Sequence, residues 1–259
     1  MTASGNTLLL RLEAPLMAFG GPVIDHHGVT GRCPGLAQLT GLLANALGWH
    51  HRDAARLERL QERLSFASVV LRPGQELVDY QTVDLGQEHL VDTGWTTRGT
   101  REDRGKGEAT RGTHIRFRHY WADSAVLVAL RLEPPDETPT LDDLVRALDE
   151  PERPLFIGRK TCLPTMPLVL GRVEATELAQ ALADAIGAED TGLPRHQQRS
   201  PDPLHVEGPA AQMTALAGIR PDQTRRVVDR RDWRNQVHGG ERLVTVGWLP
   251  DPGAGDLAP

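Results

Sequence analysis

Apolar residues at the start of the chain recur with strand and helix spacing. The unbroken apolar run inside Thr7–Glu13 predicts a buried strand, which Pro15 then interrupts. Leucines and alanines three and four positions apart predict a helix over 36–47, and Gly48 is placed to end it. A second short helix is predicted over Ala54–Leu64. The chain therefore opens as a strand followed by two helices.

Two strand-like segments come next, separated by Pro73-Gly74. Ser65–Arg72 and Gln75–Asp84 are predicted as strands, and the Pro-Gly pair between them predicts a hairpin. Leu85–Arg118 then breaks the pattern: it has almost no apolar periodicity and is dense in charge and glycine. A structureless segment of this length inside a compact domain is usually functional or disordered. We therefore expect an exposed excursion and not core.

Regular order is predicted to return after the excursion. Thr140 and Asp143 have the spacing of a capping box, and Gly187 stands where a helix would end. The predicted elements are a strand at Ser124–Glu133, a helix at Thr140–Asp149, strands at Leu155–Gly158 and Leu168–Glu174, and a helix at Thr176–Ile186. Beyond them, the strand candidates are Leu204–Glu207, Arg225–Asp229 and Leu243–Trp248.

This order of elements predicts an α+β fold of the ferredoxin-like (RRM-like) type, an antiparallel sheet covered on one side. We expect a domain over 1–187 with an insertion at 85–118. A small β-rich C-terminal region over 188–249 and a disordered tail over 250–259 would follow.

Charge is unevenly distributed along the 259 residues, whose formal net charge is −6. Arg98–Arg118 holds six arginines and one lysine against three acids, and Arg220–Arg234 holds six arginines against three acids. Glu133–Glu152 is instead strongly acidic. A protein that presents basic faces to a phosphate backbone has this distribution, although arginine-rich loops are also ordinary solvated surface.

Several classes of protein are disfavoured. No apolar run has the length of a membrane span, and the first residues lack the features of a cleavable leader, so we expect a cytoplasmic protein. Cys33 and Cys162 are too few for a disulfide framework. The adjacent pairs His26-His27 and His50-His51 diverge, so neither predicts a metal site. No nucleotide-binding fingerprint or serine-nucleophile motif is present, and we expect no cofactor.

Three turns have the chemistry of an RNA site. Met17 and Phe19 follow the first strand, where they can stack on bases or else plug the end of the core. Thr30–Arg32 precedes a helix whose free amides and nearby cation suit a phosphate. Gly158–Thr161 combines a glycine, which permits close backbone approach, with Arg159 and Lys160.

At these positions the chain resembles CRISPR-associated protein family five of subtype I-E, in matches that run in order from residue 8 to residue 171. Ala44 departs from the helix motif of the family, which has a glycine there. The segments that resemble family motifs are Leu8–Gly20, Thr30–Pro34, Leu39–Leu43 with Gly48, Asp79–Val83, Arg118–Tyr120 with Asp123, Ile157–Cys162, and Pro164 to Gly171.

The resemblance implies a ferredoxin-like fold with a protruding hairpin, or thumb, at Leu85–Arg118. It implies a subunit that is not an enzyme, binds the 5′ handle of the guide RNA (crRNA) and caps the filament of a Cascade complex in antiviral defence. Its partners would be the guide RNA, the Cascade backbone subunit and the large PAM-reading subunit, with target DNA contacted indirectly and no membrane. The thumb is expected to wedge at the junction of handle and spacer.

The candidate site residues follow from the turns and from the resemblance. The RNA-binding set is Met17, Phe19, Arg32, Arg118, Tyr120, Arg159 and Lys160. The thumb set is Trp95, Arg98, Arg101, Arg104, Lys106 and Arg111.

Two other functions compete with this hypothesis. A metal-independent endoribonuclease that processes repeat RNA would need an acid, a base and a cation around one phosphate. Its candidates are Tyr80, Lys106, His114, His119 and Tyr120. A structural adaptor without RNA contact is the third hypothesis, and the clustered cations disfavour it.

Overall fold

The computed structural model describes residues 5–21, 23, 25–84, 94–95, 101–102, 113–187, 203–213 and 219–249. Its helices are α1 (Leu36–Ala46), α2 (Ala54–Arg63), α3 (Leu141–Asp149) and α4 (Leu178–Gly187), with a 3-10 turn η3 (Ala210–Gln212). Its strands are β1 (Thr7–Met17), β2 (His27–Gly28), β3 (Leu64–Arg72), β4 (Gln75–Asp84), β5 (Gly94–Trp95), β6 (Arg101–Glu102), β7 (Thr113–Leu132), β8 (Val169–Val173), β9 (Leu204–Pro209), β10 (Arg220–Asp232) and β11 (Val237–Leu249).

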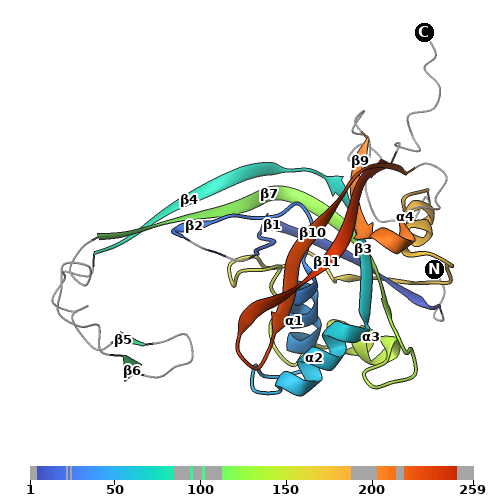
Figure 1. The fold of residues 1–259 in the computed structure, drawn as a ribbon, viewed down its shortest axis with the longest axis horizontal. Coiled ribbons are helices and arrows are strands. Elements are labelled where there is room, and N and C mark those ends of the chain that lie inside the picture. Colours follow the sequence, from blue (N-terminus) through green and yellow to red (C-terminus); the bar gives the residue numbers. More distant parts are fainter. Residues whose placement is uncertain are drawn as a thin grey trace, which may run out of the picture.

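The chain folds as a mixed α/β protein around one open, mostly antiparallel sheet (Figure 1). Its described strands lie in the order β10-β11-β9-β3-β7-β1-β8, and β2 and β4 also pair with β7. Among these pairings only that of β2 with β7 is parallel. Because β9 pairs with β3, the C-terminal strands continue the sheet of the N-terminal elements.

Both faces of the central sheet are covered, which corrects the prediction of a sheet covered on one side. Leu8, Leu10 and Leu12 of β1 face a large apolar cluster that includes residues of α1, α2 and α3. Leu9 faces a second cluster built with α4 and the C-terminal strands. A strand that is buried on both faces is apolar without alternation, as the run of leucines in β1 is.

β3 and β4 do not form the predicted hairpin. Both pair with β7, β3 with its second half and β4 with its first half. At the junction a Cβ atom on Gly74 would lie 2.4 Å from the carbonyl oxygen of Ala122, and Gly74 has a φ of +64°. The Pro-Gly pair therefore lets the chain pass along β7 in close contact with it and does not reverse the chain.

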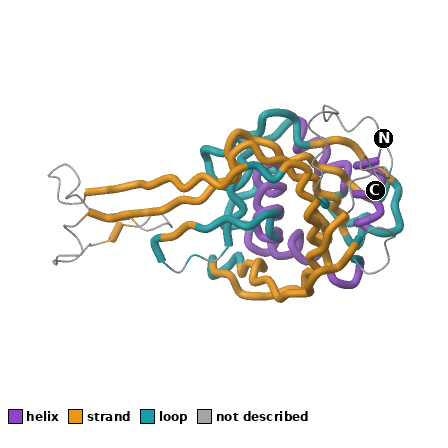
Figure 2. Tube along the Cα trace, turned by 90° about the horizontal axis from the view of Figure 1, so that it is seen from above, coloured by secondary structure: helices purple, strands orange, loops and turns teal. Residues whose placement is uncertain are grey.

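β4 and the first half of β7 form a ribbon that projects from the body of the molecule, with the short strand β2 beside β7 at Phe117 and Arg118 (Figures 1 and 2). Regular structure therefore resumes at Thr113, before the predicted end of the excursion at Arg118 and well before the predicted strand at Ser124. Apart from β5 and β6, residues 85–112 of the predicted thumb lie outside the described residues. The ribbon exposes large apolar side chains, namely Leu77, Val78, Tyr80, Val83 and Ile115.

Most other local predictions are confirmed. Thr140 and Asp143 form the capping box of α3, and Gly48 follows α1 with a φ of +76°. The predicted strand at Leu155–Gly158 is wrong, because these residues form a loop. The strands β10 and β11 are longer than predicted, and the predicted tail at 250–259 lies outside the described residues. Within the described ranges, no helix is both long and apolar enough to cross a lipid bilayer.

Candidate nucleic-acid interface

Three segments that are distant in sequence meet at the end of β1 and form what we call the basic-turn surface: residues 18–20, 30–33 and 157–162. The Gly31 amide donates to the Phe19 carbonyl at 2.7 Å, and the Ala18 amide donates to the Ile157 carbonyl at 3.2 Å. The Phe19 amide also donates to the Thr30 hydroxyl at 2.8 Å. The turns that the sequence indicated separately are thus held together by backbone contacts.

Arg159 fastens this surface to β7. Its guanidinium donates to the His119 carbonyl at 2.9 Å and to the Gly28 carbonyl at 2.8 Å, and it lies 4.6 Å from the centroid of the Tyr120 ring. Arg159 therefore has a structural role, whether or not it also contacts RNA. Its neighbour Lys160 is exposed and forms no ion pair with any residue that the structure describes, so its charge is free to meet a phosphate.

Three predicted RNA contacts are buried and are corrected here. Met17 has no exposed surface, Phe19 is 2% exposed and Tyr120 is 4% exposed. Met17 is the last residue of β1, which is longer than predicted, and its side chain joins the large apolar cluster with Phe19 and Tyr120. Base stacking needs an accessible face, so these three side chains serve the core.

Arg32 is exposed and stacked on an aromatic ring. Its guanidinium carbon lies 3.8 Å from the centroid of the Trp121 ring, and the Trp121 indole donates to the Gly31 carbonyl at 2.7 Å. One amino group of Arg32 makes a long contact of 3.4 Å with the Pro73 carbonyl. The ring thus orients the cation while leaving most of its donors available to a ligand.

A pocket of about 530 Å³ opens beside Arg32. Its other lining residues include Val70, Pro73, His205 and Trp248. Trp248 is 40% exposed, so its ring offers a face on which a base can stack. A cation beside an exposed indole is a combination suited to nucleic acid.

A smaller pocket of about 230 Å³ lies against the loop 157–162, and the sequence did not predict it. Four residues that line it each have a buried polar atom without a hydrogen-bond partner within the described part of the chain: Gln38 Oε1, Arg231 Nε, Trp233 Nε1 and His238 Nδ1. Burial and the charge of Arg231 lower the pKa of His238, which is therefore neutral near pH 7.

The basic cluster Arg220–Arg234, which contributes Arg231 to this pocket, has much of its charge paired. Arg225 contacts Glu207 at 2.9 Å, Arg234 contacts Glu58 at 3.5 Å, and Arg226 pairs with Glu241. For these arginines, the alternative of ordinary solvated or structural surface fits better than contact with phosphate.

The remaining predicted residues lie on or beyond the ribbon. Arg118 is exposed on β7, opposite Asp79 of β4. Trp95 and Arg101 are paired in the backbone of β5 and β6. The other thumb residues lie outside the described residues: Arg98, Arg104, Lys106 and Arg111.

Comparison with known proteins gives the family of the chain. A protein from Escherichia coli (strain K12) named CRISPR system Cascade subunit CasD is 33% identical over 178 residues, which cover 68% of this chain and 75% of that protein. A solved structure titled Crystal structure of Cas protein is 27% identical, with a TM-score of 0.58 and 95% of each chain covered. A chain of a CRISPR RNA-guided surveillance complex shares the fold, with a TM-score of 0.62 at 24% identity, covering 95% of this chain and 91% of that one. The family model for CRISPR-associated protein (Cas5) matches residues 7–245, and the chain therefore belongs to the Cas5 family.

Proposed function

We propose that this chain is a non-catalytic subunit of a Cascade surveillance complex, which binds the 5′ handle of the guide RNA and caps the backbone filament. The 33% sequence identity to CasD, over 68% of this chain, supports the assignment to Cascade. In this role the subunit supports recognition of target DNA in antiviral defence. We also propose that it is located in the cytoplasm.

The observation that carries the RNA-binding part of this proposal is the assembly of the basic-turn surface. Segments 18–20, 30–33 and 157–162 converge there, and they bring Arg32 and Lys160 to exposed positions. The pocket beside Arg32 offers the exposed indole face of Trp248. Cations hold phosphates, and an indole face can hold a base.

The projecting ribbon supports contact with other subunits. Tyr80 is 57% exposed, and Val78 and Val83 are each 48% exposed, which is unusual for large apolar side chains on a soluble monomer. Contact with the Cascade backbone subunit or the large PAM-reading subunit would bury them. Arg118, on the same ribbon, remains a proposed RNA contact.

For the core of the chain, we propose the ferredoxin-like arrangement. Four strands lie in the sheet order β3-β7-β1-β8. Along the chain, α1 and α2 connect β1 to β3, and α3 lies between β7 and β8. An antiparallel sheet with this connectivity is the split βαβ pattern of that fold. The strand order therefore supports the proposal.

The competing endoribonuclease is less well supported. Tyr120 is buried, and because it neighbours His119 on β7 the two side chains point to opposite faces of the strand. The His119 ring contacts Glu76 at 2.7 Å on the ribbon, away from the buried phenol. An acid and a base that act on one phosphate would have to converge.

The proposal is tested by the salt dependence of guide-RNA binding in the reconstituted complex. Arg32→Ala and Lys160→Ala should each weaken binding and make the slope of log K against log salt shallower by about 0.7 for each lost phosphate contact. Arg159→Ala is a poor probe on its own, because loss of its two bonds to backbone carbonyls should also lower the melting temperature.

Arg146→Ala is the matched control, since Arg146 is 77% exposed on α3, away from the basic-turn surface. It should leave both affinity and slope unchanged. If the Arg32 and Lys160 variants behave like this control, the basic-turn surface is not the RNA site. The nuclease would instead be established if the purified protein cleaved repeat RNA and His119→Ala abolished that cleavage.

A further inference from the structure

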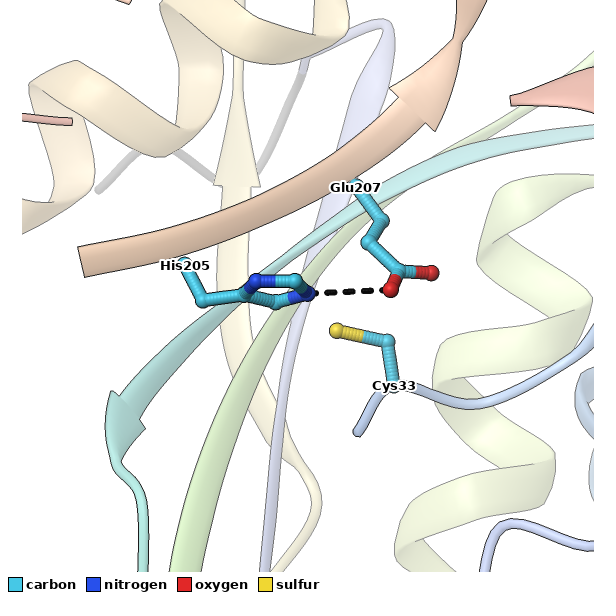
Figure 3. A group of neighbouring side chains, drawn as sticks. All are labelled: Cys33, His205 and Glu207. Carbon is cyan, nitrogen blue, oxygen red and sulfur yellow. Dashed lines mark hydrogen bonds and ion pairs between the residues drawn. The ribbon is translucent and has the colours of Figure 1, made fainter. Parts of the chain in front are cut away.

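Three side chains with metal-binding atoms converge between β9 and the turn before α1 (Figure 3). Cys33 lies in that turn, while His205 and Glu207 occupy alternate positions of β9 and so point to the same face of the sheet. One ligand atom from each residue lies within 4.8 Å of the other two. Figure 3 shows the sulfur directed toward the imidazole and the carboxylate.

The cluster is enclosed. Cys33 is 8% exposed, and the side chains of His205 and Glu207 are 19% and 15% exposed. All three belong to the described residues, and they come from two distant parts of the chain that the packing of the C-terminal strands brings together.

Polar atoms in the cluster keep unused bonding capacity. His205 Nε2 and Arg225 both contact Oε1 of Glu207 at 2.9 Å, and no described residue donates to Oε2. Ser68 lies directly across from Glu207 in the β3–β9 pair, is fully buried, and its hydroxyl has no hydrogen-bond partner in the described part of the chain. A buried hydroxyl of this kind calls for a partner that the protein itself does not provide, such as an ion or a water.

We propose that Cys33, His205 and Glu207 bind a divalent metal ion of the zinc class. A thiolate, an imidazole and a carboxylate are the ligand types that zinc takes, and three protein ligands leave a fourth tetrahedral position for water. Calcium and magnesium would be disfavoured, because they prefer oxygen ligands alone. The metal links β9 to the turn that presents Arg32, and so fixes the C-terminal strands to the basic-turn surface.

The alternative is a hydrogen-bonded cluster in which Arg225 neutralises Glu207 without a metal. Arg225 is 48% exposed, and an exposed ion pair of this kind contributes little to stability. The Arg225 side chain can turn into solvent when a metal takes its place beside Glu207. Removal of Arg225 distinguishes the two possibilities. It should raise the affinity for a metal if Glu207 is a metal ligand, whereas it should only weaken the cluster if no metal binds.

The test is titration of the untagged, chelator-treated full chain with Co²⁺, followed by competition with Zn²⁺. Cobalt bound to a thiolate in a tetrahedral site gives a near-ultraviolet charge-transfer band and intense visible bands. We expect these bands to saturate at one equivalent of cobalt and to disappear on addition of zinc. Cys33→Ser should abolish the charge-transfer band, and His205→Gln should weaken cobalt binding at least tenfold, a loss typical of disrupted metal sites.

Cys162→Ala is the matched control, because Cys162 is also buried but lies outside the cluster. It should keep the bands, and Arg225→Ala should bind zinc more tightly than the natural chain. Circular dichroism checks that each variant is folded, and if Cys33→Ser fails to fold, His205→Gln alone decides. The proposal is overturned if folded natural protein binds no cobalt at equimolar concentration. Bands that survive Cys33→Ser, or zinc affinity that falls in Arg225→Ala, would equally overturn it.

Discussion

The carbonyl oxygen of Ala18 lies 1.9 Å from the position that a Cβ atom on residue 158 would occupy. Gly158 also has a φ of +100°, which side chains of L-residues rarely adopt. Space and backbone conformation therefore both require glycine here. This glycine allows the loop 157–162 to lie against the turn after β1, and so it builds the basic-turn surface.

Gly158→Ala should lower the free energy of unfolding by about 2–4 kcal/mol, because a backbone atom and not a flexible side chain must move. Urea denaturation measures the loss. Gly187→Ala is the control, since a Cβ atom there meets nothing within 4 Å, and it should change stability by less than about 1 kcal/mol. Equal stability of the two variants would show that the loop moves without cost.

Asp229 connects the C-terminal strands to the first helix. Its carboxylate accepts a hydrogen bond from the Leu36 amide at 2.9 Å and pairs with Arg242 at 2.8 Å, and the residue is 6% exposed. The N-cap residue of α1, Gly35, has no side chain to cap the helix. A residue of β10 thus provides the cap that the local sequence lacks.

Asp229→Ala should reduce the free energy of unfolding by about 2–3 kcal/mol, because it leaves the Leu36 amide and the Arg242 guanidinium without a partner. Asp229→Asn should lose less, since an amide oxygen can still accept from the helix. Asp222→Ala, an exposed acid on the same strand, should change stability by less than about 0.5 kcal/mol. A loss for Asp229→Ala no greater than that of the Asp222 control would refute the capping role.

Glu13 gives stability a defined dependence on pH. Burial alone would raise the pKa of its carboxyl group, but hydrogen bonds and charges from Arg72 and Arg11 outweigh burial and hold the pKa below its ordinary value. Arg72 contacts Glu13 at 2.8 Å, and Arg11 is 3% exposed with Glu13 as its counter-ion. A lowered pKa in the folded state means that stability is complete above the unfolded-state pKa of about 4.3 and is lost as pH falls through the folded value.

Glu13→Gln should therefore cost about 2–4 kcal/mol at pH 7, where it leaves buried Arg11 unpaired. The difference from the natural chain should shrink as pH falls below about 4, because the natural Glu13 is then protonated as well. Urea denaturation at several pH values gives both quantities. Glu241→Gln, in an exposed pair with Arg226, is the control and should show little effect at any pH. A difference that stays constant down to low pH would disprove the role of the charge.

The sequence predicted well those helices and strands whose formation depends on neighbouring residues. The leucine run of β1 and the capping box of Thr140 and Asp143 require only neighbouring residues, so their sequence is sufficient. The Pro73-Gly74 prediction failed because a Pro-Gly pair permits several paths, and the length of β7 decides between them. Phe19 was misassigned because the turn that contains it folds back into the core.

The candidate site was predictable as a set of turns but not as a surface. Arg32 and Lys160 are exposed as expected, whereas the pocket beside Trp233 depends on how β10 and β11 cross α1. The cluster of Cys33 and His205 is likewise invisible in sequence, because it depends on the pairing of β9 with β3. Contacts made by tertiary pairing over long sequence separations have no local signal.

The ribbon defines where the thumb can be removed. Asp84 and Thr113 are the last paired residues of β4 and β7, and opposed strand ends of this kind can be joined by a two-residue turn. The sequence of 85–112 has almost no apolar periodicity. We therefore expect the segment to be dispensable for the core, and its five cations, which equal its acids in number, to act in the complex.

Replacing residues 85–112 with Asn-Gly should shift the free energy of unfolding by less than about 1 kcal/mol, because the sequence of the segment lacks the apolar periodicity of a core element. The same variant should retain less guide RNA, or bind target DNA more weakly, once assembled with the partner subunits, because the cations of the thumb are removed. A thermal melt and a pull-down with partner subunits and guide RNA measure the two effects. A Gly-Ser segment of the original length at 85–112 is the control that separates loss of charge from loss of length. Unfolding of the Asn-Gly variant would show that the segment belongs to the core, and intact assembly with normal target binding would show that it has no role in the complex.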